Sequence, residues 1–120
     1  MKIETELMRG AGPLAVLKLL ERGEMYGYEL VEALSKQSDG VLKIGQSTLY
    51  PMLYNLESKK LVTSRVDKSG SRPRKYYKLT STGKKRLAHD TEQWRAILNA
   101  MASLGVFAPA DLEGLKGAIA

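Results

Sequence analysis

The sequence predicts a mainly α-helical domain that carries one small β-hairpin and ends in a long helix. Apolar residues recur with helical spacing in the first half and again after residue 81, whereas residues 61–79 alternate as strands do. A chain of 120 residues is long enough for one compact domain and too short for two ordinary ones. We therefore expect a domain over residues 1–80, a C-terminal helix over 81–104 in the same compact unit, and a tail over 105–120.

The first helix is expected over residues 13–22. Proline is tolerated in a first helical turn, and Gly23 suits a C-terminal stop. Whether residues 2–11 form a preceding helical arm stays open, because Pro13 falls between the two segments. Since this helix is apolar around most of its circumference, we expect its own domain to cover one side and a partner the other.

Two further helices are expected over residues 27–36 and 45–57. The third helix has apolar residues at positions i, i+3, i+4 and i+7, which is the spacing of one helical face. The core residues expected from this stripe are Leu49, Leu53 and Leu56.

A β-hairpin is expected from residues 61–67 and 74–79, joined by turn residues over 68–73. Val62 and Val66 share one face of the first strand. Alternation in the second strand turns Tyr77 and Leu79 inward and leaves the basic residues on the outer face and the tip.

The long C-terminal helix begins at a Ser/Thr cluster that offers helix N-caps. It is too long for the small preceding body to cover, and its apolar residues follow the spacing of a coiled-coil seam that also includes Trp94. We expect a homodimer through this helix and the N-terminal helix, with the seam residues Leu87, Ile97, Met101 and Leu104.

Several classes of function are excluded by composition. The chain has no cysteine and one histidine, His89, which is expected to be a surface residue of the long helix. No nucleophile–base pair, carboxylate dyad or metal cluster can be assembled, so we expect no enzyme, no cofactor and no metal. No signal peptide or membrane span is apparent, which favours a soluble cytoplasmic protein with no membrane partner.

The charge is concentrated in one block. Residues 58–86 hold eleven Lys and Arg against the single acid Asp67, a net charge of +10, while the whole chain carries +6. A block of this kind is either a solvated basic surface or a binding surface for a polyanion, because clustered cations release counterions from phosphates.

The element order decides between these readings. Three helices followed by a basic hairpin are the parts of a winged helix-turn-helix, in which the third helix enters the DNA major groove and the hairpin, or wing, reaches phosphates or the minor groove. A winged-helix module that binds protein and not DNA is the alternative, and a basic RNA-binding domain is a third reading.

Three segments resemble the PadR family of bacterial transcriptional regulators, and the resemblance runs from about residue 8 to residue 100. The matching segments are residues 26–30, residues 47–57 and residues 70–80. The chain departs from the family at Lys59-Lys60, where a Gly usually ends the helix.

The single C-terminal helix resembles the short branch of this family, which includes multidrug-sensing repressors. The resemblance implies a homodimer in which the long helix forms the interface. It also implies that a Trp from each subunit lines a flat, apolar drug-binding pore, and Trp94 falls where that Trp would be.

The residues expected at a double-stranded DNA operator, an inverted repeat, come from the third helix and the wing. Thr48 could instead cap its helix, the tyrosines could be solvated, and the wing cations could be plain surface charge. The expected DNA-binding residues are Gln46, Ser47, Thr48, Tyr50, Tyr54, Lys68, Arg72, Arg74 and Lys75.

A ligand site is expected around Trp94, whose alternative role is an interface anchor. The function expected is a sequence-specific repressor that a planar hydrophobic or phenolic small-molecule inducer releases. The expected ligand-binding residues are Trp94, Thr91, Leu98, Leu7 and Leu14.

Overall fold

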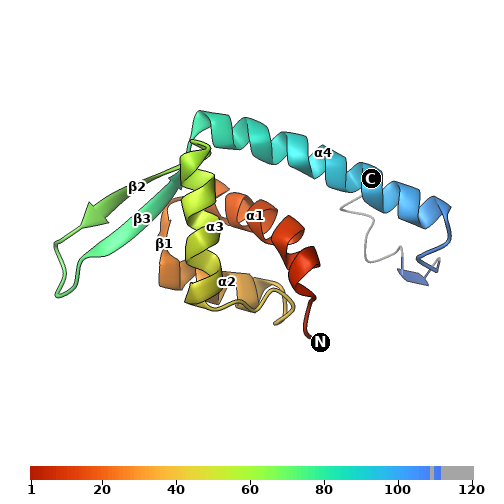
Figure 1. Ribbon diagram of the computed structural model, residues 1–120, viewed down its shortest axis with the longest axis horizontal. Helices are drawn as coiled ribbons and strands as arrows, with labels where there is room; N and C mark the ends of the chain where they lie inside the picture. Colours follow the sequence, from red (N-terminus) through yellow and green to blue (C-terminus); the bar gives the residue numbers. More distant parts are fainter. Residues whose placement is uncertain (109, 112–120) are drawn as a thin grey trace. The chain divides into compact units, whose positions relative to one another are not determined.

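The computed structural model describes residues 1–108 and 110–111, and these form four helices and one small antiparallel sheet (Figure 1). This confirms the predicted mainly α-helical class. The expected tail over 105–120 lies largely outside the described residues. In chain order the elements are α1 (Thr5–Glu21), β1 (Met25–Tyr26), α2 (Gly27–Gln37), α3 (Gln46–Ser58), β2 (Val62–Asp67), β3 (Arg74–Leu79) and α4 (Ser81–Ser103).

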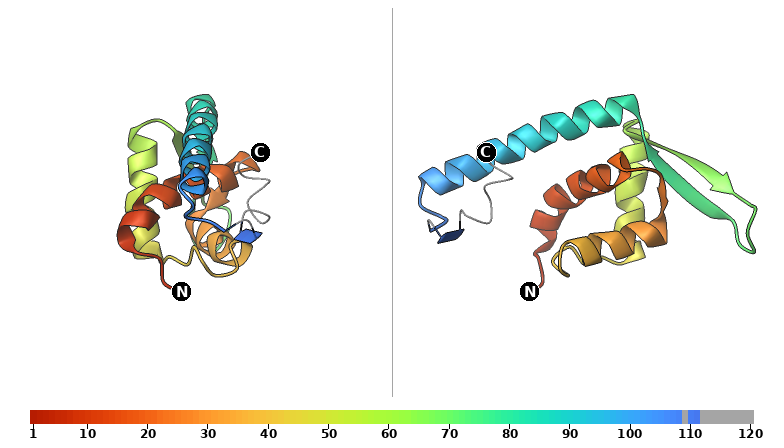
Figure 2. Two further views of the ribbon diagram at one scale, coloured as in Figure 1. Left: turned by 90° about the vertical axis from the view of Figure 1, so that its right-hand side faces the viewer. Right: turned by 180° about the vertical axis from the view of Figure 1, so that it is seen from behind.

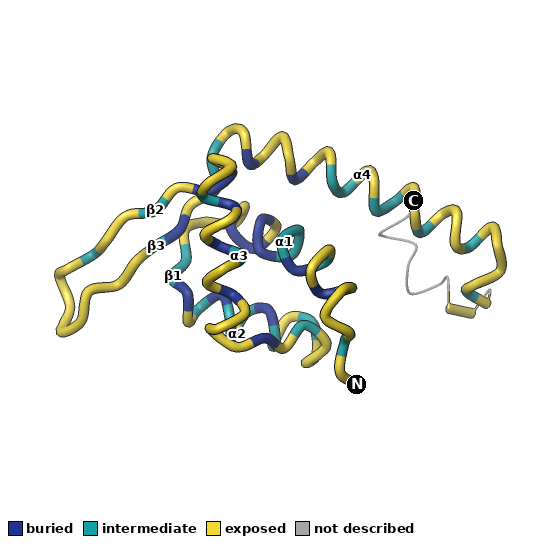
Figure 3. Tube along the Cα trace, viewed as in Figure 1, coloured by how far each residue is buried: buried dark blue, intermediate teal, exposed yellow. Residues whose placement is uncertain are grey.

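The chain divides into two compact units at residue 87, so that the first turns of α4 belong to the first unit. The core of the first unit lies among α1, α2, α3 and the base of the sheet, as the dark segments of Figure 3 show. Leu49, Leu53 and Leu56 are all buried there, which confirms the core stripe predicted for the third helix. The largest fully buried side chains are Leu17, Leu30, Leu49, Leu53, Val16 and Val62.

Helix α1 answers the question left open at Pro13. It runs without a break from Thr5 to Glu21, with Pro13 inside it. A proline removes the hydrogen bond to the carbonyl four residues earlier, and here that carbonyl belongs to the exposed residue Arg9, where water can satisfy it. The predicted helix and the predicted arm are therefore one element.

The sheet has three strands where the sequence predicted two. Strand β1 pairs with β3, with Tyr26 opposite Tyr76, and the strand order is β1-β3-β2. A two-residue strand has no periodicity of its own, so its pairing was not visible in the sequence. The hairpin of β2 and β3 is the predicted wing, and its tip extends beyond the three helices (Figures 1 and 2). Val66 is consequently 53% exposed, although Val62, which shares its face, is buried.

The start of α4 is fixed by a close contact with the base of the wing. The Thr80 side-chain oxygen accepts the N–H of Gly83 at 2.9 Å, as an N-cap should, and the Thr80 N–H donates to the Leu61 carbonyl at 3.1 Å. A Cβ at Gly83 would lie 2.0 Å from that same carbonyl oxygen. Only glycine fits at this position, because the neighbouring atom is backbone and cannot rotate away.

The backbone at the end of α3 explains how the chain accommodates Lys59-Lys60 where the PadR family usually has a glycine. Lys60 adopts φ of 60°, the left-handed conformation that glycine takes at helix ends. The N–H of the next residue, Leu61, then donates to the Leu56 carbonyl at 2.9 Å. Lysine therefore keeps the backbone path of the family's glycine, at a conformational cost of about 1 kcal/mol.

We expect Gly83→Ala to lower the free energy of unfolding by about 3 kcal/mol, because either α4 or the base of the wing must shift to admit the methyl group. Chemical denaturation of the purified variant measures this loss. Gly70→Ala is the matched control, since a Cβ at Gly70 would lie 3.9 Å from its nearest neighbour. The control should stay within about 0.5 kcal/mol of the unmodified chain, and an equal loss in both variants would contradict the role assigned to Gly83.

Candidate nucleic-acid interface

The first turn of α3 presents polar groups to the surface. Gln46, Ser47 and Thr48 are all exposed, and the N-cap residue Gly45 supplies no side-chain cap. The positive end of the helix dipole and its free N–H groups are thus accessible, an arrangement that favours phosphate oxygens. Two turns further on, Tyr54 is 72% exposed. These residues form the surface that the sequence predicted for the third helix.

Tyr50 has a second role that the sequence did not reveal. Its ring packs over the first residue of α2: a Cβ at Gly27 would lie 2.6 Å from the tyrosine hydroxyl and 3.0 Å from ring carbons. Tyr50 is still 45% exposed. The side chain therefore helps to set the spacing between α2 and α3, while part of it remains available at the surface.

The outer face of the sheet carries an Arg–Tyr cluster formed by Tyr26, Arg65, Arg74 and Tyr76. The two tyrosine rings meet edge to face, with centroids 5.5 Å apart. The Arg65 guanidinium lies 4.8 Å from the Tyr76 ring, and that of Arg74 lies 4.7 Å from the Tyr26 ring. Such cation–π contacts orient a guanidinium without neutralising it.

Glu24 closes one end of this cluster. Its carboxylate accepts two hydrogen bonds from Arg65, one of them from Nε at 3.1 Å. This pairing holds the pKa of the Glu24 carboxyl below its usual value. Arg65 therefore neutralises an acid beside the sheet, whereas Arg74, over the Tyr26 ring and opposite Asp67, forms no direct ion pair among the described residues.

Lys75 lies on the opposite face of the sheet from Arg74, because neighbouring residues of a strand alternate. Its ammonium group is 3.7 Å from a Glu57 carboxylate oxygen and 5.5 Å from the Tyr77 ring centroid. Glu57 also accepts a hydrogen bond from the Ser64 hydroxyl. These contacts join the end of α3 to the wing and give Lys75 a positioning role beside the predicted phosphate contact.

The wing tip keeps its cations free. Lys68 and Arg72 are exposed, and within the described part of the chain neither takes part in an ion pair. Asp67 bonds instead to the backbone and hydroxyl of Ser69, which lowers the pKa of its carboxyl. Of the predicted wing cations, Lys68 and Arg72 are thus without an ion-pair partner in the described ranges, while Arg74 lies opposite Asp67 and helps to lower the pKa of that carboxyl.

Sequence reasoning missed Tyr26, Glu24, Arg65 and Glu57 as residues that shape the interface. Each acts through a neighbour that is remote in sequence, as Glu24 does through Arg65, forty-one residues away. Only the pairing register of β1 could have revealed the Arg–Tyr cluster, and a strand of two residues gives no signal of it.

The second unit contains most of the residues predicted for dimerisation and ligand binding. Ile97 and Met101 on α4 are 46% and 39% exposed, and Leu104, just after the end of α4, is 79% exposed, an apolar series of the kind a seam requires. Trp94, Thr91 and Leu98 are half-buried on the same helix. Leu87 lies in the core of the first unit, so it supports the fold of one chain. On α1, Leu7 is exposed and Leu14 is half-buried.

Among residues 1–108 and 110–111, no three His, Cys, Asp or Glu side chains gather as metal ligands would. The helices found in the same residues are also too short or too polar to cross a membrane.

Comparison with known proteins links this arrangement to one family. Residues 16–89 match the model of the transcriptional regulator PadR-like family. A PadR family transcriptional regulator from Eggerthella lenta is similar, with 38% identity and a TM-score of 0.75, covering 82% of this chain and 85% of that one.

Two further relatives are longer than this chain. The Bacillus subtilis PadR structure, solved in complex with operator DNA, is 28% identical with a TM-score of 0.61, covering 66% of this chain and 45% of that one. The Escherichia coli transcriptional regulator YqjI is 31% identical over 80 residues, which are 67% of this chain and 37% of YqjI.

Proposed function

The chain belongs to the transcriptional regulator PadR-like family, and we propose that it binds operator DNA as a homodimer and represses transcription until a small ligand releases it. Members of this family are transcriptional regulators, which agrees with the prediction that the chain is not an enzyme.

One observation carries the proposal: the exposed face of α3 and the cations of the wing belong to one compact unit. Glu57 connects them through Lys75 and Ser64. In this proposal Gln46, Ser47 and Tyr54 meet base edges in the major groove, and Arg72, Arg74 and Lys68 meet phosphates. The operator complex of Bacillus subtilis PadR supports the same use of the fold.

Charge favours DNA over a protein partner. A wing that bound protein would not need a block with a net charge of +10, because that charge repels a basic partner and is costly to desolvate. Phosphates instead reward each cation through counterion release.

A dimer would set the symmetry of the operator. Two protomers related by a two-fold axis present two identical α3 helices, which favours an inverted repeat with half-sites about 34–36 Å apart or a multiple of that distance. The exposed apolar residues Ile97 and Met101 on α4, with Leu104 just after it, support an interface between copies of the chain.

The proposed inducer is a planar hydrophobic or phenolic compound that stacks on Trp94. Helix α4 begins two residues after β3 ends. A ligand that altered the pairing of two α4 helices would therefore act on the wing through the continuous chain. If the ligand binds more tightly to the dimer with altered pairing, and DNA binds less tightly to that dimer, linkage requires that the ligand weaken DNA binding.

For DNA binding, the logarithm of the association constant should fall with the logarithm of salt concentration at a slope of about −6, if the dimer neutralises six to eight phosphates. Arg72→Ala should flatten this slope by about 1 with little change in the preferred sequence, whereas Ser47→Ala should change which sequence is preferred. Fluorescence anisotropy over a salt series measures both effects.

The matched control for the salt series is Lys36→Ala, which removes one exposed lysine from α2 outside the proposed interface. Its slope should equal that of the unmodified chain. Wing variants that alter specificity and leave the slope unchanged would reverse the roles proposed for the wing and α3.

For dimerisation, Ile97→Glu combined with Met101→Glu should yield monomers in sedimentation velocity at micromolar concentration, because the two new charges would be buried unpaired. Ala96→Glu combined with Asn99→Glu is the matched control, since these exposed positions lie on the other side of α4. A monomeric mass for the unmodified chain would rule out the proposed dimer.

For the inducer, planar hydrophobic dyes should quench the fluorescence of Trp94, the only tryptophan, with micromolar affinity, and should lower DNA affinity in parallel. Trp94→Ala should abolish binding of these compounds while the circular dichroism spectrum stays unchanged. Because the alanine variant has no tryptophan fluorescence, calorimetry measures its binding of the dyes. If it binds them as tightly as the unmodified chain does, Trp94 is an interface anchor without a ligand role.

A further inference from the structure

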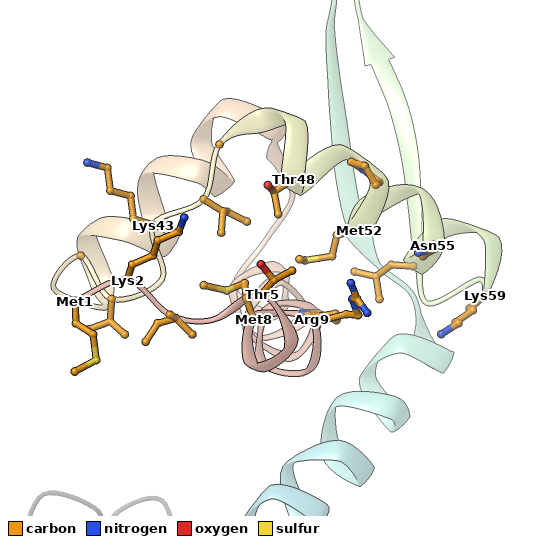
Figure 4. Close-up of a pocket in the computed structure, with 18 residues that line it drawn as sticks. Met1, Lys2, Thr5, Met8, Arg9, Lys43, Thr48, Met52, Asn55 and Lys59 are labelled. Carbon is orange, nitrogen blue, oxygen red and sulfur yellow. The ribbon is translucent and has the colours of Figure 1, made fainter.

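A groove of about 1120 Å³ runs along the first unit between α1, the loop that joins α2 to α3, and α3 itself (Figure 4). The N-terminal end of α1 and this loop lie at the same end of the unit, as Figures 1 and 2 both show. The groove is comparable in size to the larger cavities that hold small molecules in proteins.

The floor of the groove is apolar and adaptable. Met8 and Met52 lie near each other in the groove (Figure 4), and Ile44 and Leu56 also line it. Met52 reaches α1 because Gly12 has no side chain: a Cβ there would lie 2.7 Å from the Met52 methyl group. Unbranched thioether chains adjust to a flexible apolar ligand more readily than branched side chains do.

The charged side chains that line the groove are all positive. Four cations line it, and none of its lining residues is an Asp or a Glu. The remaining polar side chains at the edge, among them Thr48 and Asn55, are neutral. An apolar floor beneath cations of one sign is complementary to a molecule with an apolar body and one anionic group. The rim cations are Lys2, Arg9, Lys43 and Lys59.

The groove lies apart from most of the surface used in the proposed function, and Thr48 at its edge is a residue that the two share. Thr5, Met8 and Arg9 face it from α1, whereas Leu7 and Leu14 lie on roughly the opposite side of that helix, which has 3.6 residues per turn. Neither Tyr50 nor Tyr54 of α3 lines it. A dimer that used Leu7 and Leu14 would therefore leave the groove open.

We propose that this groove binds an amphipathic carboxylate, an acyl chain of about eight to twelve carbons with its headgroup among the rim cations. The chain lies along Met8 and Met52, and the carboxylate meets Lys2 and Lys43, which lie together at one end of the groove in Figure 4. The binding does not require DNA, so it stands or fails independently of the function proposed above.

The experiment is a titration of protein labelled with ¹³C at the methionine methyl groups, using octanoate below its micelle-forming concentration. The Met8 and Met52 methyl signals should shift and saturate. Met25 and Met101 lie outside the groove and should stay unchanged as internal controls. Octyltrimethylammonium, with the same chain and the opposite charge, should bind at least about tenfold more weakly.

The variants separate the rim from the floor. Lys2→Gln combined with Lys43→Gln should weaken octanoate binding about tenfold and leave binding of neutral 1-octanol within about twofold. Lys18→Gln combined with Lys36→Gln removes the same charge from outside the groove and should change neither ligand. Equal affinity for the two charged ligands, shifts confined to Met101, or no saturable shift would each overturn the proposal.

Discussion

The peptide groups on either side of Leu61 hold three elements of the first unit together. The Leu61 N–H closes the end of α3 on the Leu56 carbonyl, and the Leu61 carbonyl accepts the Thr80 N–H at the start of α4. Strand β2 begins at the next residue. Because Gly83 packs directly on this carbonyl, the first turn of α4 is tied to both the end of α3 and the base of the wing. The orientation of the wing relative to α3 is therefore fixed at the base of the wing as well as by the contacts along the two strands.

The cations of the basic block, residues 58–86, have two roles: some stabilise the wing and others remain exposed. Arg65 pairs with Glu24, and Lys75 lies between Glu57 and the Tyr77 ring, so these cations stiffen the wing and connect it to α3. Lys68 and Arg72 at the tip have no such partner among the described residues and keep their full field for a polyanion. A net charge read from sequence overestimates the cations free to meet phosphates, because a two-stranded wing needs some of them for its own stability.

Local patterns in the sequence were enough to predict every helix and the hairpin, because each signal lies within one element. The stripe of Leu49, Leu53 and Leu56 gave the buried face of α3, and Thr80 gave the cap of α4. What could not be predicted depends on contacts between distant residues. The Tyr50 ring over Gly27 and the pairing of Tyr26 with Tyr76 require a tertiary fold before they exist. Leu87 follows the seam spacing yet lies in the core, since spacing alone does not say which neighbour covers a residue.

Helix α3 divides its circumference among three tasks. Leu49, Leu53 and Leu56 face the core. Ser47, Tyr50 and Tyr54 face outward. Met52 and Asn55 face the groove. At 100° per residue these faces lie about 120° apart, so a ligand in the groove and a nucleic acid on the outer face would touch largely different atoms. Thr48 is the exception, since it lies in the exposed first turn of α3 and also lines the groove. Away from Thr48, one ligand could affect binding of the other only by shifting α3 as a body, and the size of that effect is a coupling free energy between the two sites.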